Sequence, residues 1–178
     1  MNLSEADNAK ALVLLESWSE KTDRIFIRML LLPAMMDLGL PHEKCVAICQ
    51  EGLNRGEDYY RIQAARLFAM VNEKHSVNGR YLEVLLRSPD VGVRVYAAKI
   101  HWRENRNAAA VVPVLTEALN RTKYQSYYYS EVQSVALTAL GDIGSEAREA
   151  TAIVEQIASA PNPNVAKQAS EALTKIRQ

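Results

Sequence analysis

The feature that most constrains the fold of this 178-residue chain is an internal repeat of about 33 residues. A similar apolar segment begins at five positions, at intervals of 33, 33, 39 and 33 residues: Ile27, Tyr60, Val93, Val132 and Val165. A second series follows the first four of these positions by 26 residues each time: Leu53, Leu86, Leu119 and Ala158. Because the two series keep step, the six extra residues of the long interval all lie between Leu119 and Val132. The repeat predicts a stack of similar units.

Both halves of each repeat have the periodicity of an amphipathic helix. After Val132, apolar side chains recur at Ala136, Ala139 and Ile143, which places them on one helical face. The chain has only 7 glycines and 6 prolines, too few for the many tight turns of a β-fold. The sequence therefore predicts an all-α fold of nine or ten helices, paired as about five helical hairpins.

Breakers that contain proline separate the two helices of a hairpin. Ser88-Pro89-Asp90 interrupts one repeat and Pro161-Asn162-Pro163-Asn164 another, and each breaker ends the first helix and supplies an N-cap for the second. We expect second helices to begin near Asp90, Ser130 and Asn164. A lone hairpin cannot bury its apolar face, so the hairpins are expected to stack into a right-handed curved solenoid.

Three segments resemble the HEAT repeat in its compact bacterial form. They are SPDVGVRVYAA (residues 88–98), AVVPVLTEAL (residues 110–119) and VALTALGDIG (residues 135–144). The resemblance is clear from about residue 59 onward and weak in residues 1–58, where Ile27-Arg28 and the 33-residue register carry it. It implies an all-α, right-handed α-α superhelix of HEAT type that forms a single domain over residues 1–178.

The resemblance also implies a ladder of hydrogen bonds from repeat to repeat. In the family, an Asp in the turn between the helices bonds an Arg at the second position of the second helix. Asp90 and Arg94 match this pattern, and Arg28 and Arg61 match the Arg position. The last two repeats lack both residues. We interpret these charged side chains as structural, because ion pairs of the scaffold fill such positions.

A binding surface is expected on the concave side, which positions 2, 6, 9 and 10 of each second helix line in HEAT-like arrays. In the second repeat these positions hold Ile62, Arg66, Ala69 and Met70, and in the third they hold Val95, Lys99, Trp102 and Arg103. An aromatic side chain among cations is typical of a protein-binding hot spot. The predicted groove residues are Arg66, Lys99, Trp102, Arg103 and Arg106. The alternative is that Trp102 packs against the next repeat while the charges are solvated.

The charge distribution favours a protein partner with an acidic segment. The chain has 21 basic and 21 acidic residues, but residues 61–123 hold eleven basic and five acidic ones. Such a basic belt between acidic ends can steer an acidic segment into the groove. The same arginines could equally serve as good helix formers on the surface.

The insertion before Val132 is a second candidate surface. It carries four of the eight tyrosines: Tyr124, Tyr127, Tyr128 and Tyr129. Aromatic rings with hydrogen-bonding tips favour an interface, and insertions in single repeats often carry the binding function. The alternative is that Tyr128 or Tyr129 fills the gap left by the missing Asp of the ladder.

Metal and enzyme chemistry find little support in the sequence. His42, Cys45 and Cys49 share one face of a predicted helix over residues 42–53, but a closed zinc site needs four ligands, and His75 and His101 stand alone. We expect buried thiols, a core histidine at position 101, and neither metal nor cofactor. The chain has no phosphate-binding glycine loop and no nucleophile elbow. These absences predict a non-catalytic interaction or scaffold module.

Two alternatives stay open on the resemblance. Some HEAT-like proteins are DNA glycosylases, and Trp102 with Asp142 would suit that activity, although a neutral chain argues against nucleic-acid binding. The chain could also be an accessory HEAT module or a subunit of a larger enzyme, such as a bilin lyase. No signal pattern opens the sequence, and its longest apolar stretch, residues 29–36, is too short to span a membrane. We expect a cytoplasmic protein, or an extracytoplasmic one if it is part of a longer exported chain.

Overall fold

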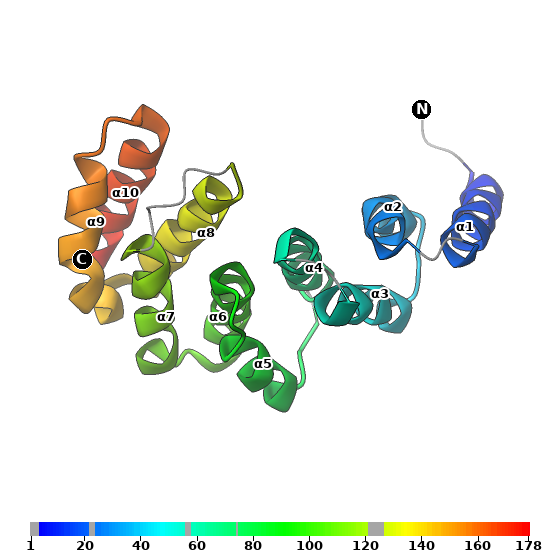
Figure 1. The fold of residues 1–178 in the computed structure, drawn as a ribbon, viewed down its shortest axis with the longest axis horizontal. Coiled ribbons are helices and arrows are strands. Elements are labelled where there is room, and N and C mark those ends of the chain that lie inside the picture. Colours follow the sequence, from blue (N-terminus) through cyan, green and yellow to red (C-terminus); the bar gives the residue numbers. More distant parts are fainter. Residues whose placement is uncertain (1–3, 22–23, 56–57, 74, 121–126) are drawn as a thin grey trace. The chain divides into compact units, whose positions relative to one another are not determined.

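The computed structural model describes residues 4–21, 24–55, 58–73, 75–120 and 127–178. Throughout these residues the regular elements are helices, and they include no strand (Figure 1). The predicted all-α class is therefore confirmed for the described part of the chain. By its contacts the chain divides into two compact units, Met1–His75 and Ser76–Gln178.

Met1–His75 contains four helices, coloured blue to cyan in Figure 1: α1 (Glu5–Glu20), α2 (Ile25–Asp37), α3 (His42–Arg55) and α4 (Asp58–Val71). Each helix packs against the next along the chain, and α2 also contacts α4. The core between them is built from aliphatic, sulfur-containing and aromatic side chains, among them Met29, Leu32, Cys49, Ala64 and Phe68. The predicted helix over residues 42–53 is confirmed as α3.

Ser76–Gln178 contains six α-helices and one 3-10 segment: α5 (Gly79–Leu86), α6 (Val91–Asn105), α7 (Ala108–Asn120), α8 (Tyr127–Ile143), η1 (Gly144–Ala150), α9 (Thr151–Ala158) and α10 (Pro163–Ile176). Within this unit α5 packs on α6, α7 on α8 and α9 on α10. The second helices α6, α8 and α10 also contact one another in turn, and α7 contacts α9. Gly144, at a φ of +70°, makes the left-handed turn between α8 and η1.

The repeat register and the helix starts agree with the prediction. Every position of the first series lies in an even-numbered helix, and every position of the second lies in the last turn of an odd-numbered one. Helix α6 begins directly after Asp90, whose Oδ1 accepts from the backbone N–H groups of Gly92 (2.8 Å) and Val93 (3.2 Å). Asn162 caps α10 in the same way, with Pro163 at the first helical position.

Close packing in the first unit makes Gly52 a sensitive position. A Cβ atom added there would lie 2.8 Å from the Cβ of Ala64 and 2.5 Å from the Sδ of Met29. We expect Gly52→Ala to lower the free energy of unfolding, because overpacking costs about 1–3 kcal/mol, more than the ~1 kcal/mol gained in helix propensity. Urea unfolding followed by circular dichroism measures this change. The matched control is Gly79→Ala, whose added Cβ meets nothing within 4 Å, and which should be neutral or stabilising.

Candidate protein-binding pocket

An open, largely apolar pocket of about 180 Å³ lies between α2 and α4 in the first unit. Helix α2 contributes Phe26, Met29, Leu30 and Pro33, and α4 contributes Tyr59, Gln63, Arg66, Leu67 and Met70. The spacings of both sets, i, i+3, i+4, i+7 in α2 and i, i+4, i+7, i+8, i+11 in α4, place each set on one helical face. The two faces meet because α2 and α4 pack against each other.

The pocket has a buried apolar floor and an exposed apolar rim. Met29 and Leu67 are buried and form part of its wall. Leu30 and Met70, in contrast, are 61% and 43% exposed. Large apolar side chains exposed at the edge of a pocket mark a surface that gains free energy when a ligand covers it.

The polar side chains of the pocket give it a positive character. Arg66 is exposed, while Gln63 and Tyr59 are half-buried. None of the lining residues is acidic. A ligand with a carboxylate near Arg66 would therefore meet attraction without a competing negative charge from the lining.

Two of the pocket residues, Arg66 and Met70, belong to the face that the sequence assigned to the groove. The contribution of α2 was not predicted. Its buried residues are Met29, Leu32 and Met35, whereas Ile27, the expected core position of the first repeat, is exposed. The 3-4 spacing of Phe26, Leu30 and Pro33 was the available signal, but the repeat match is weakest in this part of the chain.

The structure places the predicted groove residues of α6 in different environments. Trp102 is only 8% exposed, and its Nε1 has no hydrogen-bond partner among the described residues. The Arg106 guanidinium carbon lies 5.1 Å from the centre of the indole ring, and Arg103 donates to its neighbour Glu104 at 2.6 Å. Lys99 is exposed. The burial of Trp102 agrees with the packing alternative and not with an aromatic anchor exposed in a groove.

Position 2 of the second helices is also buried, contrary to the expected groove face. Val95 is fully buried and Ile62 nearly so. Helix α6 contacts α5, α7 and α8, so neighbours cover more of its circumference than the single face assumed from the sequence. Positions 6 and 10 do remain exposed in α8 and α10, at Thr138, Asp142, Glu171 and Lys175.

The residues assigned to a structural ladder do pair, but with different acids. Asp90 caps its own helix, while Arg94 bonds the carbonyl oxygens of Ser88 (2.7 Å) and Pro89 (3.1 Å) and pairs with Glu117 of α7 at 2.9 Å. In the first unit Arg28 of α2 pairs with Glu51 of α3.

Both arginines of these pairs precede their glutamates by 23 residues, an offset that sequence reasoning could have found. Arg61 holds the equivalent position in α4 and is half-buried. The recurring pair links the second helix of one hairpin to the first helix of the next in both units.

The tyrosine candidates fall largely outside what the structure describes. Tyr124 lies outside the described residues, and so do the side chains of Tyr127, Tyr128 and Tyr129, whose backbone forms the first turn of α8. Their role at an interface stays a prediction.

The histidines and cysteines form no metal cluster in the described residues. Cys45 and Cys49 are buried free thiols, and burial raises the pKa of both, which keeps them protonated and unreactive. His42 does not stand apart from His75: their rings stack at 4.0 Å, and His42 Nε2 lies 3.0 Å from Asn72 Oδ1. His101, expected in the core, is half-buried, with Nδ1 3.3 Å from Asn105 Nδ2.

Comparison with known proteins gives no match: no family model, no curated protein and no solved structure matches the chain. The HEAT resemblance thus stays a prediction. Among the described helices, none is long and apolar enough to cross a membrane.

Proposed function

We propose that the chain is a non-catalytic repeat module of HEAT type that binds a protein partner through the pocket between α2 and α4. The observation that carries this proposal is the pocket itself, an apolar hollow with exposed Leu30 and Met70 at its edge and Arg66 beside them. Sites of this kind bind an amphipathic helix by its apolar face. Methionines suit such a surface because their flexible side chains adapt to the ligand.

The solenoid part of the proposal is supported by which helices touch. Contacts of α6 with α8, α8 with α10, α7 with α9 and, in the first unit, α2 with α4 are those that stacked hairpins make. The pairs Arg28–Glu51 and Arg94–Glu117 add a repeated polar link at one offset. A right-handed superhelix of about five hairpins is the arrangement that we propose from them.

The chemistry of the partner follows from the pocket lining. Its binding segment would carry two or three large apolar residues at helical spacing, to cover Leu30, Leu67 and Met70. It would also carry an Asp or Glu placed to reach Arg66. This matches the acidic partner that the charge distribution of the sequence suggested.

The proposal is tested by selecting peptides from a random display library on the immobilised full chain. We expect selected peptides to combine helical apolar spacing with an acidic residue. In fluorescence anisotropy, Leu30→Asp should then weaken binding by about tenfold or more, since it places a charge in the apolar contact. Arg66→Glu should weaken it too, by a factor that shrinks as added salt shortens the screening length below about 10 Å.

The matched control is Val84→Asp, which makes the same kind of change at an exposed apolar residue of α5 and should leave peptide affinity unchanged. Selected peptides that bind the Leu30→Asp and wild-type chains equally well would place the binding surface elsewhere. A short DNA duplex is the second arm. Asp142 is paired with Lys175 at 3.1 Å and Trp102 is buried, so we expect only weak, salt-sensitive duplex binding and no base release.

A further inference from the structure

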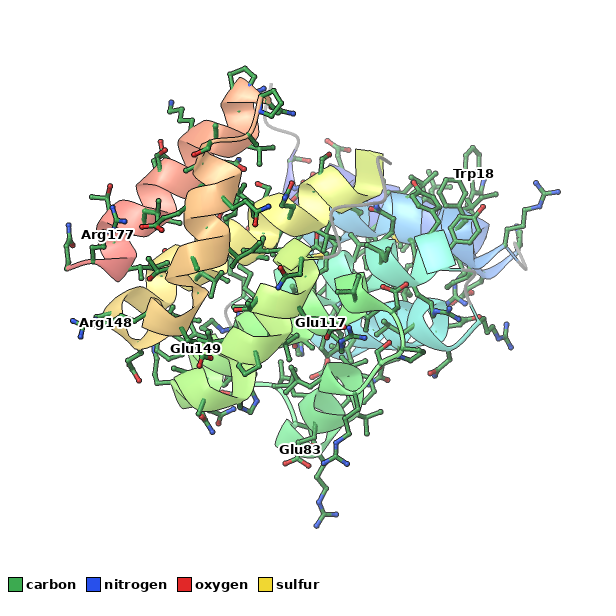
Figure 2. The ribbon with its side chains drawn as sticks, turned by 60° about the vertical axis from the view of Figure 1, so that its left-hand side comes forward. Trp18, Glu83, Glu117, Arg148, Glu149 and Arg177 are labelled. Atoms are coloured by element: carbon green, nitrogen blue, oxygen red, sulfur yellow. The ribbon has the colours of Figure 1, made fainter. Side chains whose placement is uncertain are left out.

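Helix α1 exposes an apolar surface that its neighbours leave uncovered. Val13, Leu14 and Trp18 are all largely exposed, Leu14 at 65% and Trp18 at 69%. Figure 2 shows the Trp18 side chain projecting away from the ribbon. The central residues 12–15 read Leu-Val-Leu-Leu, apolar on every side of the helix. Helices of that composition are normally covered all round, and the end helices of repeat arrays normally present a polar outer face.

The exposed side of α1 carries an ordered stripe of charges and apolar groups. At 100° per residue, Asp7, Lys10, Leu14, Trp18 and Lys21 fall within about 60° of one another around the helix axis. All five are exposed. Read along the helix, the stripe is acidic, basic, aliphatic, aromatic and basic, with Leu14 at its centre.

We propose that a second copy of this chain packs on this stripe, with the two α1 helices antiparallel about Leu14. In that register Leu14 meets Leu14 of the second copy, Asp7 faces Lys21, and Lys10 faces the Trp18 ring. Two-fold symmetry makes each unlike contact twice. The pairing thus contains two ion pairs and two cation–π contacts around one apolar centre.

The charges of the stripe select this occupant and this direction. A parallel pairing would place Asp7 against Asp7 and each lysine against its own copy, which is repulsive. The antiparallel pairing turns every one of those clashes into an attraction. The stripe is therefore complementary to itself, and the chain supplies its own matching partner.

The surface is already formed in the single chain. Ser4 caps α1 by accepting from the N–H of Asp7 at 3.2 Å, and Glu16 accepts from Lys44 of α3 at 2.6 Å, which fixes the opposite side of the helix in the first unit. A helix of 16 residues is about 24 Å long. One such helix pair buries less than the roughly 1,200 Å² of a standard interface, so we expect a weak dimer, populated above about 10–100 µM.

Sedimentation velocity of the full chain over about 5–500 µM tests the proposal. Wild type should shift from monomer to dimer across this range. Leu14→Glu should raise Kd about 100-fold or more, since the substitution enters the interface twice at its centre. Val84→Glu is the matched control, an equally exposed apolar residue (66%) on α5, and should dimerise like wild type.

A charge exchange tests the register. Asp7→Lys and Lys21→Glu should each stay monomeric where wild type is dimeric, and a 1:1 mixture of the two should associate again, because both cross pairs are then of opposite charge. Circular dichroism checks that each variant keeps its helices. A wild-type chain that stays monomeric to 500 µM, a dimer that tolerates Leu14→Glu, or a mixture that fails to associate would each overturn the proposal. The pocket between α2 and α4 takes no part, so peptide binding should survive in Leu14→Glu.

Discussion

Replacing Ala136 by Asp is expected to unfold the helices of Ser76–Gln178. Ala136 is 0% exposed in α8, which packs against α6, α7 and α10. An unpaired carboxylate buried there loses its hydration, and the helices must separate to restore it. The cost exceeds the 4–5 kcal/mol at the upper end of ordinary substitutions and approaches the 5–15 kcal/mol that holds a domain folded. Circular dichroism and thermal melting of the variant measure the loss directly.

The matched control lies two residues further along the same helix. Thr138 is exposed, and its hydroxyl donates to the backbone carbonyl of Ser134 at 2.9 Å. Thr138→Asp adds the same carboxylate where water can reach it, and we expect a change within about 1 kcal/mol. If Ala136→Asp melted like wild type, the face of α8 that we place in the core would be wrong.

The helices and their starts could be predicted from sequence because the signals are local. The periodicity of Ala136, Ala139 and Ile143 depends only on residues within a few turns. Asp90 and Asn162 act as caps through their own backbone neighbours. A repeat adds certainty, since each unit reports independently on the same register.

The environments of the side chains could not be predicted in the same way. Counting angles around a helix assumes one buried face, but α6 is covered by three neighbours, and so Val95 and Trp102 are buried. The pairing of Arg94 with Glu117 and the stacking of His42 on His75 join residues 23 and 33 positions apart. Those contacts depend on how neighbouring hairpins are placed, which the pattern within one hairpin does not contain.

The candidate pocket was half predictable for the same reason. Arg66 and Met70 lie on a helix whose register follows the clear part of the repeat. Leu30 and Phe26 lie on α2, where the buried positions are Met29, Leu32 and Met35 and the expected core residue Ile27 is exposed. A helix at the weak end of a repeat can rotate about its axis without disturbing the register of the others, so its outer face must be read from the structure.

Trp102→Ala is expected to lower the free energy of unfolding by about 3–5 kcal/mol, the usual cost of removing a buried aromatic side chain. The indole is 8% exposed, and truncation removes its packing as well as its contact with the Arg106 guanidinium. Trp18→Ala is the matched control, the same chemical change at a residue that is 69% exposed. We expect that control to lose less than about 1 kcal/mol in urea unfolding.

The chain contains only these two tryptophans, so each variant leaves the other as its single fluorescent reporter. In Trp18→Ala the remaining indole is buried, and its emission should be blue-shifted and resist quenching by acrylamide. In Trp102→Ala the remaining indole is exposed, and its emission should be red-shifted and readily quenched. These spectra measure the position of Trp102 without a binding partner. If Trp102→Ala instead kept wild-type stability, and Trp102 were quenched as readily as Trp18, the indole would lie on the surface, where it could serve as the aromatic anchor that its cationic neighbours suggested.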